Sequence, residues 1–322
     1  MDRVRLFADT IIPARFLQEE LIWETPKGTK IYTAKNGNKQ CDPKTLFLKM
    51  RDANHPEKNG ILREYQSLQL LQSSLGKNEL RNTVPQPLDF DSEINCFAMT
   101  GLDGISVQKG VYFRLITGLN VNRLLPMAGA IGEWIGRFQC ATKRTSRVNI
   151  SSELHTVLSK LALCPGLSDN ATKMFESAIK DAIDRSSSTN AVFCHGDFAL
   201  RNVLFTEDGR VAVLDWEHMY IGHPLADPVW LVSNILLSTR YLARLGTIMP
   251  IVREFLGSWR NRTKDIGVPV ETVVGLFVAG LVNRMFQLRT KTDIILKKRV
   301  LAHFSRLGLC LLQEWHQTKL FQ

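Results

Sequence analysis

The chain has 322 residues, of which 44% are hydrophobic and 22% charged, an ordinary globular composition that excludes collagen-like, low-complexity and wholly disordered proteins. This length predicts two domains, or one two-lobed unit with a sizeable core. Its 41 basic and 31 acidic residues give a net charge of +10, and the segment after residue 222 holds 14 of the basic and 6 of the acidic ones. Such an excess favours anionic partners such as nucleotides, phosphorylated sugars or acidic surfaces, although a solvated basic face without a specific partner gives the same count.

The sequence shows no signal for export or membrane insertion. Its longest apolar run, 273–282, is about half of the roughly 20 residues that a membrane-spanning helix needs. The first residues have no long apolar core followed by a small-residue cleavage site. The six cysteines are scattered without a C-x-x-C pair, which argues against a zinc site and a disulfide framework. We therefore expect reduced thiols and a cytoplasmic protein without a transmembrane segment.

The first hundred residues predict a β-rich lobe with one main helix. The expected strands are residues 21–23, 30–33, 46–50 and 96–99, with turns at 26–28 and 36–37. A helix is expected after Asn59-Gly60, because apolar side chains then recur at helical spacing. We place the boundary after Leu102, which gives an N-lobe at 1–102 and a C-lobe at 103–322.

The rest of the chain predicts mostly helix. Helical patterns cover 128–141 and 170–185 and return from about residue 225 to the end. In the first of these, Gly129, Gly132 and Gly136 mark a face that another element can approach closely. One short β region interrupts the helices, with a strand at 191–194 and a later hairpin around Glu207-Asp208-Gly209.

The most informative segment is the run C-H-G-D-F-A-L-R-N-V-L-F at 194–205, followed after the hairpin by L-D-W-E at 214–217. It presents a carboxylate at Asp197, an amide oxygen at Asn202 and a second carboxylate at Asp215. Carboxylate and amide oxygens suit Mg²⁺, and the remaining carboxylate can accept a proton from an attacking hydroxyl. Glu217 is either a further metal ligand or a charge at a helix start. A metal clamp, a base and positioning groups are the parts that phosphoryl transfer needs.

The pattern H-G-D-x-x-x-x-N followed by L-D-W-E resembles the aminoglycoside phosphotransferase and choline kinase family. These are small-molecule kinases with the protein-kinase-like fold, so the resemblance implies an α+β, bilobed protein, with a small β-rich N-lobe and a larger, mostly helical C-lobe. It implies Asp197 as the catalytic residue, and Asn202 and Asp215 as the ligands of Mg²⁺. His195 and Asp227 would support the catalytic loop.

The resemblance extends upstream, over roughly residues 20 to 235. Phe47-Leu48-Lys49-Met50 resembles the kinase strand that carries the phosphate-binding lysine, which makes Lys49 that lysine and Glu64 its partner on the next helix. Thr100 and Leu102 fall where the hinge would meet the adenine ring. Gly28 belongs to the turn that would cover the phosphates, but residues 25–30 contain only this one glycine, so a nearby lysine could supply charge instead.

These residues predict a Mg²⁺-dependent phosphotransferase that moves the γ-phosphate of ATP or GTP to a hydroxyl of a small molecule. The basic C-terminal region argues against a polycationic acceptor and favours a neutral or anionic one, such as a sugar-containing metabolite or a less cationic antibiotic. The alternative is a catalytically inactive kinase-like module that binds a nucleotide or a partner. A protein kinase is disfavoured because no activation loop is evident, and nucleic-acid binding because the aromatic residues do not alternate with the charges.

Overall fold

A computed structural model describes residues 7, 16–24, 28–36, 45–52, 55–56, 58–108, 111, 121–164, 167–185, 189–239, 245–268 and 270–288. Contacts divide the chain into two compact units. The first unit holds residues 1–105 and 202–219, and the second holds 106–201 and 220–322. The division into lobes at 1–102 and 103–322 stays a prediction.

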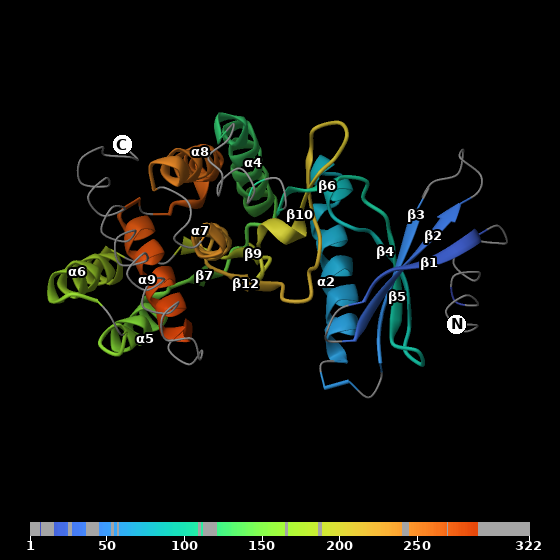
Figure 1. The fold of residues 1–322 in the computed structure, drawn as a ribbon, viewed down its shortest axis with the longest axis horizontal. Helices are drawn as coiled ribbons and strands as arrows, with labels where there is room; N and C mark the ends of the chain where they lie inside the picture. Colours follow the sequence, from blue (N-terminus) through green and yellow to red (C-terminus); the bar gives the residue numbers. More distant parts are fainter. Residues whose placement is uncertain are drawn as a thin grey trace. The chain divides into compact units, whose positions relative to one another are not determined.

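The first unit is built on a five-stranded antiparallel sheet in the order β1-β2-β3-β5-β4 (Figure 1). Its strands are β1 (Phe16–Glu24), β2 (Thr29–Asn36), β3 (Thr45–Arg51), β4 (Pro87–Asp91) and β5 (Cys96–Thr100). Helix α2 (Asn59–Leu75) packs against β3, β4 and β5, and the short helix η1 (Glu79–Thr83) follows it. The helix buries Ile61, Leu68 and Leu71, the positions that helical spacing selects.

A hairpin from later in the chain completes the first unit. It consists of β10 (Val203–Phe205) and β11 (Val211–Val213), and β6 (Ile105–Ser106) pairs with β10. Its tight turn ends at Gly209, whose φ of +78° favours glycine because it lies in the left-handed region. The hairpin expected around Glu207-Asp208-Gly209 is therefore confirmed, and it leads directly to Asp215.

The second unit is mostly helical. Its helices are η2 (Val121–Leu124), α4 (Leu125–Ala141), α5 (Ser151–Leu161), α6 (Asp169–Arg185), α7 (Ala226–Thr239), α8 (Leu245–Thr263), η4 (Lys264–Ile266) and α9 (Val270–Leu288). Two short antiparallel pairs join β7 (Arg147–Val148) to β8 (Thr189–Asn190) and β9 (Val192–Cys194) to β12 (Tyr220–Gly222). The short helix η3 (Leu200–Asn202) connects this unit to the hairpin.

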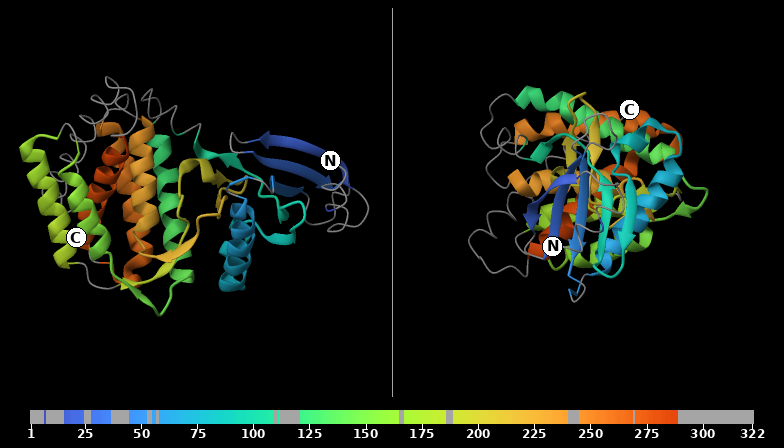
Figure 2. Two further views of the ribbon diagram at one scale, coloured as in Figure 1. Left: turned by 90° about the horizontal axis from the view of Figure 1, so that it is seen from below. Right: turned by 90° about the vertical axis from the view of Figure 1, so that its right-hand side faces the viewer.

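Two groups of helix contacts organise the second unit (Figure 2). Helix α9 lies between the α5–α6 pair and α7. Helix α4 packs along α8, where a Cβ atom built on Gly132 would overlap the backbone carbonyl of Phe255. The expectation that the glycine face of α4 meets another element closely is confirmed, and that element is α8.

Several predictions fall partly outside the described residues. These are the turn at 26–28 apart from Gly28, the hairpin at Asn36-Gly37 apart from Asn36, and the helical pattern beyond residue 288. Among the described helices, none is long and apolar enough to cross a membrane. Cys96, Cys140, Cys164 and Cys194 are not in disulfide bonds, whereas Cys41 and Cys310 lie outside the described part.

Candidate functional site

The first group of predicted site residues meets in the first unit around Lys49. Strand β3 directs this side chain toward α2, and Lys49 Nζ lies 2.5 Å from Glu64 Oε2. The same ammonium donates to Asp215 Oδ1 at 2.7 Å. The structure therefore brings together the lysine and glutamate that the sequence pairs, and adds the aspartate of the L-D-W-E segment.

Burial and charge act against each other at this cluster. Burial alone would lower the pKa of Lys49, but the carboxylates of Glu64 and Asp215 outweigh it and raise this pKa above the ordinary range. Burial raises the pKa of Glu64 to about 7, with Lys49 opposing and Asp215 adding to the rise. Lys49 is thus held as an ammonium between two acids, a position in which a lysine can bind phosphate oxygens.

Asp215 and Glu217 belong to a sharply turned segment after β11. Asp215 has a φ of +68°, in the left-handed region that residues other than glycine adopt rarely. The turn is held from both sides, because Leu214 N–H donates to the carbonyl of Asn202 at 2.9 Å and the buried Trp216 indole donates to the carbonyl of Val213 at 3.0 Å. The strained backbone is therefore enforced by its surroundings, as at many functional sites.

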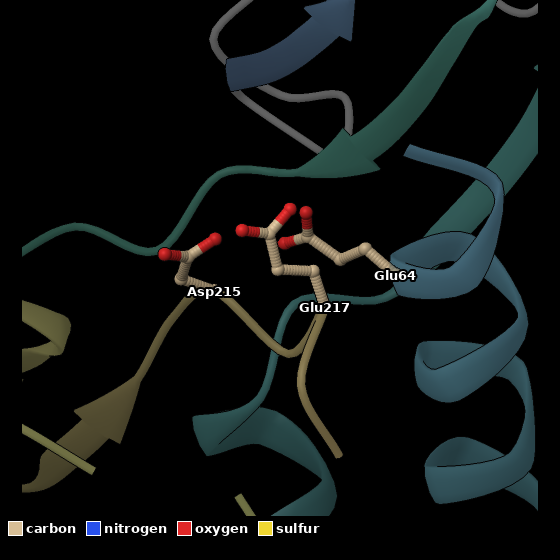
Figure 3. Close-up of side chains that lie close together, drawn as sticks. All are labelled: Glu64, Asp215 and Glu217. Carbon is tan, nitrogen blue, oxygen red and sulfur yellow. The ribbon is translucent and has the colours of Figure 1, made fainter. Parts of the chain in front are cut away.

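Three carboxylates converge at this turn. Figure 3 shows Glu64 from α2 facing Asp215 and Glu217, with the carboxylate of Glu217 between the other two. One oxygen from each carboxylate lies within 4.8 Å of one oxygen of each of the others, close enough for the three to share one cation. All of these ligand atoms are hard oxygens, which fits Mg²⁺ better than a softer metal.

Arg51, which sequence reasoning missed, adds a second cation to the cluster. Its side chain is only 5% exposed, and Nη2 lies 3.4 Å from Glu217 Oε2. Its Nε donates to Thr29 Oγ1 at 2.8 Å. Alternation along a strand could have indicated this residue, because Arg51 lies two positions after Lys49 and so on the same face of β3.

The remaining predicted nucleotide contacts lie at two other places in the first unit. Gly28 has a φ of +70° and directly precedes β2. Thr100 ends β5, and its N–H and hydroxyl are bonded to the carbonyl and N–H of Gln86. An adenine contact at this hinge would therefore use the Thr100 carbonyl or the backbone of Leu102.

The second group of predicted residues lies in the second unit, where Asp227 supports the loop that carries Asp197. Its buried carboxylate accepts the backbone N–H of His195 at 2.7 Å and that of Gly196 at 3.0 Å. Burial raises the pKa of Asp227 to about 6, although both of these hydrogen bonds lower it. His195 in turn accepts the backbone N–H of Asp197 at Nδ1, 3.2 Å away. The backbone that presents Asp197 is thus fixed by the two residues predicted to support it.

Two donors that the sequence did not reveal act on the Asp197 carboxylate. The Trp230 indole donates to Oδ1 at 3.1 Å, and the Arg201 guanidinium forms an ion pair with Oδ2. The Asp197 side chain is 13% exposed and that of Arg201 is 52% exposed, so the cation lies on the solvent side of the pair. The arrangement leaves an oriented carboxylate beside an accessible positive charge.

Comparison with known proteins supports the protein-kinase-like fold. The model of the phosphotransferase enzyme family matches residues 39–255, more than half of the chain, and the chain therefore belongs to this family. The α+β, protein-kinase-like fold and the membership in a family of small-molecule kinases predicted from the sequence are confirmed. A comparison with curated proteins finds no match.

Solved structures of this fold include proteins with different acceptors. A putative aminoglycoside phosphotransferase from Ralstonia eutropha has a TM-score of 0.62 at 13% identity, with 97% of this chain and 98% of that chain covered. A choline kinase from Cryptosporidium parvum has a TM-score of 0.57 at 10% identity, with 99% and 97% covered. A thermostable mutant of an aminoglycoside phosphotransferase, in a ternary complex with ADP and hygromycin B, has a TM-score of 0.56 at 11% identity, with 96% and 98% covered. At these identities the likeness shows the fold alone.

Proposed function

We propose that this protein transfers the γ-phosphate of ATP or GTP to a hydroxyl group of a small molecule. The observation that carries the proposal is the Lys49 ammonium held at 2.5 Å from Glu64 and 2.7 Å from Asp215. A buried lysine between two acids from different elements is expensive to desolvate. It is the arrangement that a kinase needs to grip the phosphates of a nucleotide beside its metal ligands.

The residues of each unit have separate tasks in this reaction. In the first unit, Lys49 binds phosphate oxygens, while Glu64 holds its flexible stem. Asp215 and Asn202 provide oxygen ligands for Mg²⁺, and the position of Glu217 among the carboxylates favours it as a further ligand over a helix-start charge. The metal, when bound, offsets the negative charge of the phosphates. Gly28, Thr100 and Leu102 are the proposed contacts to the rest of the nucleotide.

In the second unit, Asp197 is the proposed catalytic base. Its carboxylate orients the acceptor hydroxyl and takes up its proton, while Trp230 and the loop held by Asp227 and His195 fix its direction. The reaction forms a bond from the acceptor oxygen to the γ-phosphorus and breaks the bond to the β-phosphate oxygen, with no covalent enzyme intermediate. Catalysis then rests on positioning and on charge stabilisation.

The surroundings of Asp197 favour a neutral or anionic acceptor. Arg201 places a half-exposed positive charge on the carboxylate that the hydroxyl must reach. A polycationic acceptor would bring its ammonium groups against this guanidinium, which is unfavourable at short range. A sugar-containing metabolite or a weakly charged antibiotic fits better. The scattered free thiols and the nucleotide donor favour the cytoplasm as its location.

An inactive nucleotide- or partner-binding module is the alternative, and the glycine-poor segment at 25–30 favours it. One set of measurements distinguishes the kinase from the inactive module. Binding of ATP and GTP, with and without Mg²⁺, is followed by the rise of the thermal midpoint, because a ligand specific for the folded state must stabilise it. Wild type is compared with Asp215→Ala and with Asp208→Ala, which removes an exposed acid from the hairpin that precedes Asp215.

A stabilisation that needs Mg²⁺, survives in Asp208→Ala and is lost in Asp215→Ala supports the nucleotide site and identifies the donor. Transfer of phosphate from that donor to members of an acceptor panel, lost in Asp197→Asn, then supports the kinase. Binding without transfer to any acceptor would favour the inactive module. No stabilisation by either nucleotide would contradict the kinase and would favour a module that binds a partner instead.

A further inference from the structure

Arg51 contacts both Thr29, at the start of β2, and Glu217 of the carboxylate cluster. It is the last residue of β3 and pairs across the sheet with Thr29, the first residue of β2. Thr29 directly follows Gly28, the one glycine of the turn at 25–30. Lys49 is two residues earlier on β3, so that both cations point to the same side of the strand.

Two hydrogen bonds of this guanidinium, to Thr29 and to Glu217, differ in length. Nε donates to Thr29 Oγ1 at 2.8 Å, a normal length, whereas Nη2 lies 3.4 Å from Glu217 Oε2, near the limit for a hydrogen bond. Helix α2 leaves room for this ion pair through Gly60, where a Cβ atom would lie 2.7 Å from Arg51 Nη1 and 2.8 Å from Glu217 Oε2. The Thr29 bond therefore anchors the side chain, and the Glu217 contact is the weaker of the two.

A phosphate-covering loop normally binds its ligand through backbone N–H groups that glycines expose. With one glycine in this turn, that source of binding is reduced. Lys49 shares its ammonium with Glu64 and Asp215, which leaves fewer of its three donors for phosphate. A second cation beside the turn would supply the missing interaction, and arginine offers several donors that match phosphate geometry.

We propose that Arg51 is a second phosphate-binding residue of the nucleotide site, which rests on the function proposed above. Its Nε keeps the bond to Thr29, while Nη2 exchanges the carboxylate of Glu217 for a phosphate oxygen. The exchange leaves Glu217 available as an oxygen ligand for the divalent cation. Phosphate binding by Arg51 and ligand supply at the carboxylate cluster are then coupled through one side chain.

The test compares nucleotides that differ only in the number of phosphates. Dissociation constants for ATP, ADP and AMP, and for the guanosine series, are measured with Mg²⁺ by titration calorimetry. Arg51→Met removes the cation, Arg51→Lys keeps the charge, and Thr29→Val removes the anchor with little change of shape. Arg63→Met removes an exposed arginine from α2 in the same unit and is the matched control.

Arg51→Met should weaken triphosphate binding about ten- to hundredfold, the range for losing a charge-assisted hydrogen bond, and change AMP binding less than about threefold. Arg51→Lys should recover part of the loss, Thr29→Val should weaken the triphosphate several-fold, and Arg63→Met should change nothing. If Arg51 had only a structural role, Arg51→Met would weaken the binding of all three nucleotides to the same degree. That result would overturn the proposal. If Arg51→Met fails to fold, Arg51→Lys and Thr29→Val decide between the same outcomes.

The result also separates this inference from the function on which it rests. Mg²⁺-dependent triphosphate binding that is lost in Asp215→Ala but unchanged in Arg51→Met would leave the kinase site intact and refute the role of Arg51. Absence of triphosphate binding by the wild-type protein would refute both.

Discussion

The buried carboxylate of Asp227 accepts the backbone N–H of His195, which lies 32 residues earlier in the chain, at a distance of 2.7 Å. The other oxygen of the same carboxylate accepts the N–H of Gly196, a glycine with a φ of +81°. One side chain at the start of α7 thus satisfies two consecutive backbone donors of the loop that presents Asp197. Buried donors of this kind are costly to leave without an acceptor.

Replacing Asp227 with asparagine should weaken this loop. An amide has one acceptor oxygen, so that its NH₂ group must face one of the two N–H groups. We expect the free energy of unfolding to fall by about 1–3 kcal/mol, with a loss of phosphate transfer that exceeds any loss of nucleotide binding. Urea unfolding measures the first effect. Asp181→Asn, at an exposed position of α6, is the control, and equal stability of the two variants would contradict the supporting role of Asp227.

Trp230→Phe should lower turnover without lowering nucleotide affinity. The substitution keeps an aromatic ring but removes the indole N–H that lies 3.1 Å from Asp197 Oδ1. We expect a decrease in kcat of about ten- to thirtyfold, corresponding to about 1.4–2 kcal/mol, the value of a hydrogen bond to a charged group. The measurement is transfer of phosphate from the donor at saturating concentration, with the affinity for the nucleotide determined separately.

Trp259→Phe is the matched control for that substitution. It removes the same kind of N–H, here bonded to Gln139 Oε1 at 2.8 Å between α4 and α8. This variant should lose stability but keep its turnover per folded molecule. If both variants lose turnover to the same degree, the Trp230 bond has no particular role in directing Asp197.

Features that depend on neighbouring residues could be predicted from the sequence. The spacing from Asp197 to Asn202 and the hairpin before Asp215 are local, because turn residues and short strands determine them. The Lys49–Glu64 pair could also be predicted, because residues 47–50 and the helix that follows resemble the kinase segments that carry such a pair. The glycines of α4, Gly132 among them, predicted a close contact with another element. The sequence could not identify α8 as that element, because many helices can pack against a glycine face.

The contacts that sequence reasoning missed join residues far apart in the chain. Arg51 and Glu217 are separated by 166 residues, and Asp197 and Trp230 by 33. Each contact depends on the final packing of an element whose own pattern is ordinary: an arginine at a strand end, and a tryptophan within an apolar helix. The left-handed backbone of Asp215 could not be predicted either, because aspartate adopts that conformation only occasionally.

Gly60→Ala should weaken nucleotide binding even though alanine favours helices. A Cβ atom at this position would overlap Arg51 Nη1 at 2.7 Å and Glu217 Oε2 at 2.8 Å, and the ion pair would have to move. We expect at least a several-fold loss of Mg²⁺-dependent ATP or GTP affinity, measured by calorimetry. Gly257→Ala in α8 is the control, because no atom lies within 4 Å of its added Cβ. That variant should gain about 0.5–1 kcal/mol of stability, the helix propensity difference. Unchanged affinity in Gly60→Ala would show that the pair tolerates displacement.

His223 should make the protein less stable as the pH falls below neutrality. Burial lowers the pKa of His223 from 6.5 to about 4, with the charge of Glu153 opposing the shift. In the unfolded chain the imidazole takes up a proton below pH 6.5. Its contribution to stability is therefore complete above that pH and is lost as the pH falls toward about 4. Asp227 acts in the opposite direction, since its pKa is raised to about 6, so a titration of the wild-type protein alone would mix the two effects.

The comparison of wild type with His223→Gln isolates the histidine. Between pH 7.5 and pH 5, the free energy of unfolding of the wild type should fall by about 2 kcal/mol more than that of the variant, the value expected for a shift of this size. Urea unfolding across this range provides the measurement. His155→Gln, at an exposed position of α5, controls for the general effect of losing an imidazole. Parallel curves for wild type and His223→Gln would mean that His223 reaches solvent and takes up its proton normally in the folded protein.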